Sequence, residues 1–428
     1  MKQEMTGAEI VLQSLVDQGV EVVFGYPGGA VLPIYDTLFK HNSIKHVLVR
    51  QEGGAIHAAE GYARSTGKVG VVLVTSGPGA TNVVTGLTDA MMDSIPIVCI
   101  TGQVPQHLIG SDAFQECDTT GITRPCTKHN YLVKDPNKLS PVFHEAFTIA
   151  QDGRPGPVLI DIPKDVQFAN GTYTEKEKVI IPSHRLFEPE IFKNDEKINE
   201  VLNLISKAKK PIFYIGGGCI NSGPKASELV AQLVEMTGAP ATMTLMGLGV
   251  LGSSHPNSLG MLGMHGMYEA NMAMHDCDVM INIGARFDDR VTGRLDAFSP
   301  NSKKIHIDID ESNINKTIKV DVPVVGDVTS VLKRVVKTWK DNNLQTNESD
   351  LKLWWDKINK WKKIDCLHFT NNEKEIKPQY AIQRLYELTK DKNTFITTEV
   401  GQHQMWAAQY YKFEKPNRWL TSGGLGTM

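Results

Sequence analysis

A glutamate between an expected strand and an expected helix is the residue best placed to do chemistry in this sequence. Glu52 follows the apolar run 47–49 and precedes a stretch rich in glycine and alanine. A partly buried carboxylate at such a junction can take part in acid/base catalysis. The same position also suits a carboxylate that interacts with helix N-terminal amides, which is worth about 0.3–1 kcal/mol. Spacing alone favours this structural alternative.

Two glycine-rich turns lie near Glu52 in the sequence. The apolar run 69–75 leads into Ser76-Gly-Pro-Gly-Ala-Thr-Asn82, and Gly25-Tyr-Pro-Gly-Gly29 follows an earlier apolar run. Pro-Gly pairs are common in ordinary tight turns, so a purely structural role stays open. Strand ends that lie side by side can also frame a cofactor pocket. We expect the strand before Glu52 and the strand before Ser76 to be such neighbours.

Apolar runs alternate with amphipathic segments along the whole chain. This pattern predicts an α/β fold of consecutive doubly wound domains with parallel sheets. The strands expected in the first unit are 20–24, 45–49, 69–75, 95–101 and 158–162. A second unit is expected to contain the helix 195–207 and the strands 211–215, 279–283 and 304–309, and a third the helix 378–389 and the strand 394–398.

These units give a division into domains. We expect an N-terminal domain over 1–168, a polar linker over 169–194, a central domain over 195–340, a charged connector over 341–375 and an incomplete third domain over 376–428. The connector is rich in tryptophan. We expect these tryptophans to attach it to a neighbouring domain rather than to bind a ligand.

Composition excludes several classes of function. The 428 residues are 41% hydrophobic and 22% charged, with a formal net charge of −3. This balance provides no basic surface for nucleic acid, and no apolar run reaches the ~20 residues that span a membrane. The first residues lead directly into a helical pattern without a targeting segment, which predicts a cytoplasmic location. The six cysteines form no CxxC pair, so reduced thiols are expected.

Further motifs give the chain a family resemblance. With the segments around Glu52, they resemble the large catalytic subunits of the acetolactate synthase (acetohydroxyacid synthase) family of thiamine-diphosphate enzymes, from about Met5 to Met428. The motifs are Thr101-Gly-Gln-Val-Pro105, Asp112-Ala-Phe-Gln-Glu116, Gly153-Arg-Pro-Gly-Pro157, Met264-His-Gly266 and Gly284-Ala-Arg-Phe-Asp-Asp-Arg-Val-Thr-Gly293. Many motifs in the right order are more specific than any lone glycine pattern.

The resemblance implies an activity, cofactors and partners. It implies a transferase of branched-chain amino acid biosynthesis that decarboxylates pyruvate and condenses the two-carbon unit with a second 2-oxo acid. Thiamine diphosphate, Mg²⁺ and FAD are the implied cofactors, with no redox step for the flavin. A homodimer with active sites between subunits is implied, together with a regulatory small subunit.

The resemblance also implies roles for residues in the first and third domains. Glu52 would hydrogen-bond the aminopyrimidine N1′, the Gly29 backbone would face a developing oxyanion, and Gln103 would face the substrate. These three form the expected catalytic set. The expected contacts to thiamine diphosphate are Gly28, Pro78, Asn82, Val400, Gly401, Gln402, His403, Gly424, Leu425 and Met428.

Flavin and substrate contacts are expected from the same resemblance. Arg286, Gln115 and Lys128 would contact substrate, and Arg286 would bind its carboxylate through a guanidinium fork. Without the family, surface salt bridges are equally good roles for Arg154 and Arg286. The expected FAD contacts are Arg154, Gly216, Gly217, Gly218, Thr244, Leu245, Met264, His265, Gly266, Gly284, Arg286, Asp308 and Asp327.

One departure from the family pattern concerns the metal site. The family's Gly-Asp-Gly motif and downstream Asn, which bind the metal and the diphosphate, are not reached before Met428. We therefore expect a C-terminally truncated large subunit whose Mg²⁺ ligands lie beyond the chain end, and we assign no metal ligand within it. Two alternatives remain: another thiamine-diphosphate lyase or oxidase, and a non-catalytic flavin-binding fragment.

Overall fold

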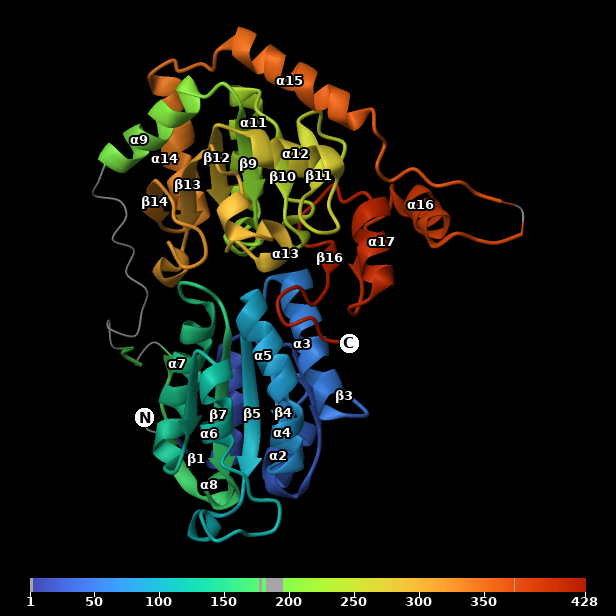
Figure 1. Ribbon diagram of the computed structural model, residues 1–428. Coiled ribbons are helices and arrows are strands. Elements are labelled where there is room, and N and C mark those ends of the chain that lie inside the picture. The colour runs from blue at the N-terminus through green and yellow to red at the C-terminus, as the bar shows by residue number, and fades with distance from the viewer. Residues whose placement is uncertain (1–2, 177–178, 182–194, 373) are drawn as a thin grey trace. The chain divides into compact units, whose positions relative to one another are not determined.

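The computed structural model describes residues 3–176, 179–181, 195–372 and 374–428, which belong to two compact units (Figure 1). The first unit comprises 1–187 together with 422–427, and the second comprises 188–421 together with 428. Each unit has its own six-stranded sheet.

All strands of the sheet in the first unit are parallel, in the order β3-β2-β4-β5-β7-β6. The strands are β2 (Val22–Tyr26), β3 (Lys45–Leu48), β4 (Gly70–Val74), β5 (Ile97–Gln103), β6 (His129–Leu132) and β7 (Pro157–Pro163). The predicted parallel sheet is therefore confirmed. The half-buried edge strand β6, with the sequence His-Asn-Tyr-Leu, was missed because it lacks an apolar run.

Helices cover both faces of this sheet. Val71 and Leu73 of β4 pack in one apolar cluster with α1, α2 and α7, whereas Val72 and Val74 pack in a second cluster with α3 and α5. Burial on both faces explains why β4 reads as a continuous apolar run. The helices are α1 (Gly7–Asp17), α2 (Leu32–Lys40), α3 (Glu52–Thr66), α4 (Pro78–Asn82), α5 (Val84–Asp93), α6 (Thr119–Thr123), α7 (Leu139–Gln151) and α8 (Lys164–Phe168).

Two details of the first unit differ from expectation. The strand before Glu52 and the strand before Ser76 are not neighbours, because β2 lies between β3 and β4. The chain also does not begin directly with a helix: β1 (Gln3–Thr6) precedes α1 and pairs antiparallel with β8 (Asn170–Tyr173). Part of the predicted linker 169–194 is thus a strand, and its residues 177–178 and 182–194 lie outside the described residues.

The second unit contains another parallel sheet, in the order β11-β10-β9-β12-β13-β14. Its strands are β9 (Pro211–Ile215), β10 (Ala241–Met243), β11 (Ser258–Met261), β12 (Val279–Ile283), β13 (Lys303–Asp308) and β14 (Val322–Val325). Helices α9, α11 and α14 pack on one face, and α12 and α15 on the other. This arrangement confirms the prediction of a second doubly wound sheet.

Two helices of this unit, α9 and α16, have the predicted bounds. They are α9 (Asp195–Lys207), α10 (Gly218–Asn221), α11 (Pro224–Thr237), α12 (Tyr268–Asp276), α13 (Asp289–Thr292), α14 (Val328–Asp341), α15 (Glu348–Lys362), α16 (Pro378–Thr389) and α17 (Gln402–Tyr410). Near the end, β15 (Ile396–Thr397) pairs parallel with β16 (Trp419–Leu420). Among the described residues, no helix has the length and hydropathy needed to cross a bilayer.

The connector helix α15 is attached through its tryptophans, as predicted. Trp354 is 1% exposed and donates from Nε1 to the Pro211 carbonyl at 3.0 Å. Trp355 donates to the Gly238 carbonyl at 2.9 Å. Buried indoles that reach backbone carbonyls combine a large apolar contact with a satisfied N–H group.

We predict that Trp354→Ala destabilises the second unit by about 3–5 kcal/mol, because it removes a fully buried aromatic side chain and leaves a cavity. Urea unfolding monitored by fluorescence measures the change. The neighbouring Leu353 is 69% exposed, so Leu353→Ala is the matched control. Equal effects of the two substitutions would show that α15 is not held by this contact.

Candidate functional site

The sheet of the first unit has a topological switch point between β2 and β4. The connection from β2 to β3 runs through α2 on one face, and the connections from β3 to β4 and from β4 to β5 run through α3 and α5 on the other. Ligands of open parallel sheets bind where the connections diverge, beyond the carboxyl ends of the strands. The turns after β2 and β4 and the start of α3 all lie at this edge.

Glu52 is the first residue of α3 and hydrogen-bonds a side chain from the turn after β4. Its Oε2 accepts from Asn82 Nδ2 at 2.8 Å. The side chain that caps α3 is instead Gln51, whose Oε1 accepts from the Gly54 amide at 3.2 Å. A Cβ on Gly79 would lie 2.8 Å from the Thr75 side chain and 3.6 Å from Glu52 Oε1, so this glycine allows α4 to lie close to Thr75 beside the carboxylate. The structure brings Glu52 and Asn82 together, as the sequence suggested.

The two glycine-rich turns are joined through Thr75. The Ala30 amide donates to Thr75 Oγ1 at 3.2 Å, and a Cβ on Gly28 would come within 2.5 Å of the Thr75 side chain. Gly28 is thus required for this close approach. Gly29 is exposed, with nothing within 4 Å of the position of a Cβ. Thr75 was not predicted as a site residue, although its place at the end of an apolar strand is a usable signal.

A second contact brings the loop after β5 to the turn after β4. Gly77 has a φ of +53°, and a Cβ there would lie 2.7 Å from the carbonyl oxygen of Gln115. Gln115 itself has a φ of +60°. Pro78, the first residue of α4, is exposed beside this contact. Gln115 and Pro78 therefore lie at the edge that carries Glu52.

Gln103 lies at the carboxyl end of β5, and its side chain points into the protein. It is 3% exposed and donates to Asp161 Oδ2 at 2.9 Å and to the Cys117 carbonyl at 2.8 Å. Asp161 also accepts from Thr101 Oγ1 at 2.7 Å. Burial raises the pKa of Asp161 to about 7. Asp161 was not predicted, and a single charge within the apolar strand β7 is the signal that could have found it.

Arg154 and Lys128 have their cationic groups on backbone carbonyls. Arg154 donates to Ser94 Oγ at 2.8 Å and to the Met91 carbonyl at 3.0 Å, at the carboxyl end of α5. This is a favourable position for a cation. Lys128 Nζ contacts the carbonyls of Ile149 and Asp152, and burial lowers its pKa to about 8. Their expected ligand contacts remain predictions.

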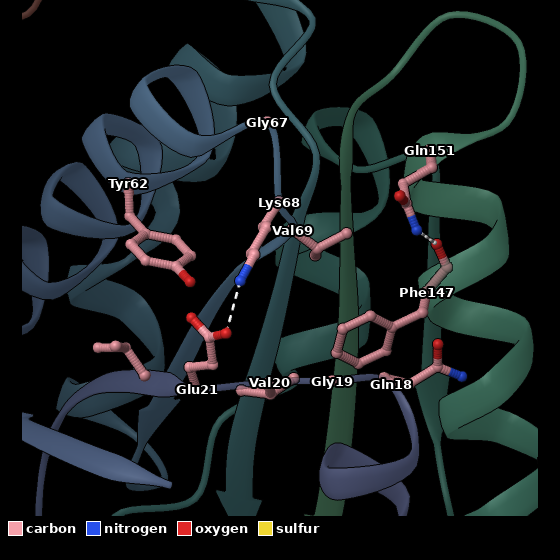
Figure 2. Close-up of a pocket in the computed structure, with 11 residues that line it drawn as sticks. Gln18, Gly19, Val20, Glu21, Tyr62, Gly67, Lys68, Val69, Phe147 and Gln151 are labelled. Atoms are coloured by element: carbon pink, nitrogen blue, oxygen red, sulfur yellow. Dashed lines mark hydrogen bonds and ion pairs between the residues drawn. The ribbon is translucent and has the colours of Figure 1, made fainter.

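A cavity of about 340 Å³ lies at the other edge of this sheet, near the amino ends of β2 and β4 (Figure 2). Lys68 and Glu21 form an ion pair of 2.6 Å across it, and both side chains are about half exposed or more. Ligands of open parallel sheets bind at the carboxyl ends of the strands. We therefore do not assign this cavity to the cofactor.

The glycines of the central sheet lie where two neighbouring strands end. A Cβ on Gly216, after β9, would lie 2.2 Å from the Gly284 carbonyl oxygen, after β12, and Gly284 has a φ of +65°. A Cβ on Gly218 would lie 2.8 Å from Gly284 Cα. At Gly217 the nearest atom would be 3.1 Å away, on Met246. The two loops thus meet backbone to backbone, and the amides of Gly216 and Gly218 donate to the carbonyls of Ile283 and Gly284 at 2.9 and 3.0 Å.

Other expected flavin residues follow strands of the same sheet. Thr244 accepts from the Gly247 amide, Asp308 accepts from the Asp310 amide, and Asp327 accepts from the Ser330 amide at the start of α14. Arg286 pairs with Asp288. Leu245 and Gly266 are half-buried, and Met264 and His265 are exposed between β11 and α12.

The third group of expected residues divides between the two units. Val400 and Gly401 precede α17 of the second unit, and Gln402 and His403 form its exposed first turn. Gly424 and Leu425 belong to the segment 422–427 of the first unit. Met428 is 93% exposed.

Comparison with known proteins identifies the family. Three models of thiamine pyrophosphate enzymes match the chain: the N-terminal TPP binding domain over 5–122, the central domain over 198–335 and the C-terminal TPP binding domain over 399–428. The acetolactate synthase large subunit of Buchnera aphidicola subsp. Schizaphis graminum is 51% identical over 99% of this chain and 73% of its own length. The isozyme 3 large subunit of Escherichia coli is 49% identical with the same coverage.

The chain belongs to the acetolactate synthase family. The chloroplastic acetolactate synthase of Arabidopsis thaliana is also similar, with 47% identity over the whole chain and 62% of its own length. Membership confirms the resemblance found in the sequence, and the N-terminal thiamine pyrophosphate binding domain model covers the strands β2 to β5 of the first sheet. The roles of individual residues and the domain boundaries stay predictions.

We predict that Asp161→Asn changes how stability depends on pH. A carboxyl whose pKa rises from 3.8 unfolded to about 7 folded stabilises the fold fully below pH 3.8, and this contribution is lost as the pH rises through 7. The variant, neutral at all pH values, should gain roughly 2–4 kcal/mol relative to wild type between pH 4 and pH 8. Urea unfolding across this range measures it. Asp36→Asn, at an exposed ion pair, is the control, and a pH-independent difference for Asp161→Asn would contradict the assignment.

Proposed function

We propose that this chain provides the catalytic residues of a thiamine-diphosphate-dependent acetolactate synthase, acting on pyruvate and a second 2-oxo acid. The observation that carries the proposal is the Glu52–Asn82 pair at the switch point, in a chain about half identical to acetolactate synthases. Glu52, Asn82 and the glycine-rich turns lie at one edge of one sheet. These are the elements needed to hold a flat heteroaromatic ring and share a proton with it.

The roles proposed for the residues follow from their chemistry. Thiamine diphosphate, when bound, supplies the carbon chemistry of decarboxylation and two-carbon transfer. Glu52 would hold a proton shared with a pyrimidine ring nitrogen, and Asn82 would orient that carboxylate. Gly28 and Gly29 would present backbone amides to a developing oxyanion. Gln103, whose side chain hydrogen-bonds the buried Asp161, would help to shape the substrate side of the site.

FAD and Mg²⁺ complete the proposed cofactor set. Gly216 and Gly218 allow the loops after β9 and β12 to approach Gly284 backbone to backbone, and this pair of loops is the proposed flavin cradle. Arg286, close to this cradle in the sequence, would bind an anionic group of the flavin or a substrate carboxylate. Mg²⁺ is proposed from family membership, and no residue of this chain is proposed as its ligand.

A homodimer is proposed from the course of α3. Glu52 is its first residue, whereas Arg64, in its last turn, contacts the Asp93 carboxylate that binds the segment 422–427. At about 1.5 Å per residue, these ends of α3 are roughly 18 Å apart. Glu52 of one copy and Gly424 of another would therefore share an active site more readily than those of one copy. A regulatory small subunit is proposed as a further partner, since relatives are named large subunits.

We predict that Glu52→Gln lowers acetolactate formation from pyruvate by at least about 100-fold, because it removes the proton-sharing carboxylate while keeping its shape. The assay contains thiamine diphosphate, Mg²⁺ and FAD. It is run on the 428-residue chain and on a chimera that adds the part of the Escherichia coli relative that the chain does not match.

Glu21→Gln is the matched control, since Glu21 is an exposed carboxylate at the opposite edge of the same sheet. Turnover by the chimera alone would indicate that the added part is needed. Full activity of Glu52→Gln in any form that turns over would contradict the proposed site, and no product from either form would contradict the proposed function.

We predict that Arg286→Ala weakens FAD binding about tenfold or more, because it removes a charged hydrogen bond to an anion. Flavin fluorescence quenching gives the affinity without any need for turnover. Arg294→Ala is the control, since Arg294 forms a similar i, i+2 ion pair with Asp296 on the surface. Equal affinities for the two variants would exclude Arg286 from the flavin site.

A further inference from the structure

The segment Ser422–Thr427 is bound by two carboxylates of α5. Asp93 accepts the Gly423 amide on Oδ2 at 2.8 Å and the Gly424 amide on Oδ1 at 2.7 Å. Ser422 Oγ donates to Asp89 Oδ1 at 2.6 Å and accepts the amides of Gly426 and Thr427 at 3.0 and 2.9 Å. The side chains of Asp93 and Ser422 thus accept hydrogen bonds from four backbone amides of this short segment.

The carboxylates are buried and supported by a cation. Asp89 is 3% exposed, and Asp93 pairs with Arg64 at 2.7 Å, with its side chain 3% exposed. Placing a carboxylate in such surroundings is costly unless its oxygens are paired. Here an arginine and two backbone amides provide charge-assisted bonds to Asp93. Because both carboxylate oxygens of Asp93 accept backbone amides, the orientation of the segment is fixed as well as its position.

The segment needs such support because of its sequence. Three of the four residues Gly423-Gly-Leu-Gly426 are glycine, and Gly426 has a φ of +75°. Glycine loses more conformational freedom on ordering than any other residue. A segment of this composition has few side-chain contacts of its own, so the carboxylates of α5 fix its conformation.

We propose that Asp93, with Asp89 and Arg64, forms a carboxylate clamp that positions the segment 422–427 for cofactor binding. The proposal deepens the function proposed above, on which it rests, because Gly424 and Leu425 are the cofactor contacts expected in this segment. The clamp residues are positioning residues, since they act through the segment's backbone. A neutral clamp would leave the segment mobile, and cofactor binding would then have to order it.

Hydrogen exchange of the 428-residue chain, followed by mass spectrometry, tests the clamp. In Asp93→Asn, the amides of Gly423 and Gly424 should exchange at least about tenfold faster, because two charge-assisted bonds are weakened. Ser422→Ala keeps the Arg64–Asp93 pair and should release Gly426 and Thr427. If Asp93→Asn disturbs α5 itself, the Ser422→Ala result decides whether these side chains order the segment. Asp36→Asn is the control, and unchanged exchange of 423–427 in both clamp variants would overturn the proposal.

Titration with thiamine diphosphate and Mg²⁺ in the same experiment tests the positioning role. Wild type should reach full protection of the segment at a cofactor concentration about tenfold lower than Asp93→Asn, with equal protection at saturation. Equal midpoints would overturn the positioning role even if the clamp orders the segment. A third outcome is faster exchange in Asp93→Asn, as expected, together with exchange in wild type that does not change when cofactor is added. This outcome would also overturn the positioning role and would count against the proposed function. The contact between α5 and the segment would then be structural only.

Discussion

Burial of both faces of the first sheet is the constraint on which the site depends. Strands covered on both sides are held in one register, because a one-residue slip would move every side chain to the opposite apolar cluster, whose close packing does not match its shape. In β4, Val71 and Leu73 pack into one apolar cluster, and Val72 and Val74 pack into the other. A fixed register brings the carboxyl ends of β2, β3 and β4 to one edge, and only then can Glu52, Asn82 and the glycine turns meet.

Helices α3 and α5 carry this order across the unit. They run side by side, and a polar contact joins them at each end: Glu52 with Asn82 just before α5, and Arg64 with Asp93 in their last turns. Between these ends, Ile56 of α3 packs directly on Gly86 of α5, where a Cβ would lie 2.1 Å from its side chain. Alanines of α3 share the same apolar cluster with Leu87 and Ala90 of α5. A change in the packing of α3 against α5 would therefore shift both the proposed proton-sharing carboxylate of Glu52 and the segment 422–427.

The sequence predicted most of the fold, because alternating apolar runs report burial directly. In the first sheet every strand except β6 was found, and in the second β9, β12 and β13 were found, whereas β10, β11 and β14 were missed. The helices α9 and α16 were placed to the residue. The order of the strands could not be predicted from apolar runs. β2 lies between β3 and β4 because the connecting helices α2 and α3 pack on opposite faces of the sheet, and no local sequence pattern encodes this. The edge strand β6 and the short β1–β8 pair lack an apolar run and were missed for that reason.

The candidate site was predicted less completely than the fold. Glu52, Asn82 and the glycine turns stand out by residue type and spacing, and the structure brings them together. The orientation of Gln103 toward Asp161, the use of Arg154 at the end of α5 and the carboxylates that hold Gly423 and Gly424 all depend on contacts between distant residues. Tertiary packing determines such side-chain partners, so the periodicity of a single segment cannot predict them.

The most direct test is a crystal structure of the protein with thiamine diphosphate and Mg²⁺ bound. The account predicts that a pyrimidine ring nitrogen lies within about 2.5–3.2 Å of a Glu52 carboxylate oxygen, close to the turns that contain Gly28 and Asn82. A pyrimidine ring bound elsewhere, for instance in the cavity at the opposite edge of the sheet, with Glu52 making no contact to it, would contradict the account.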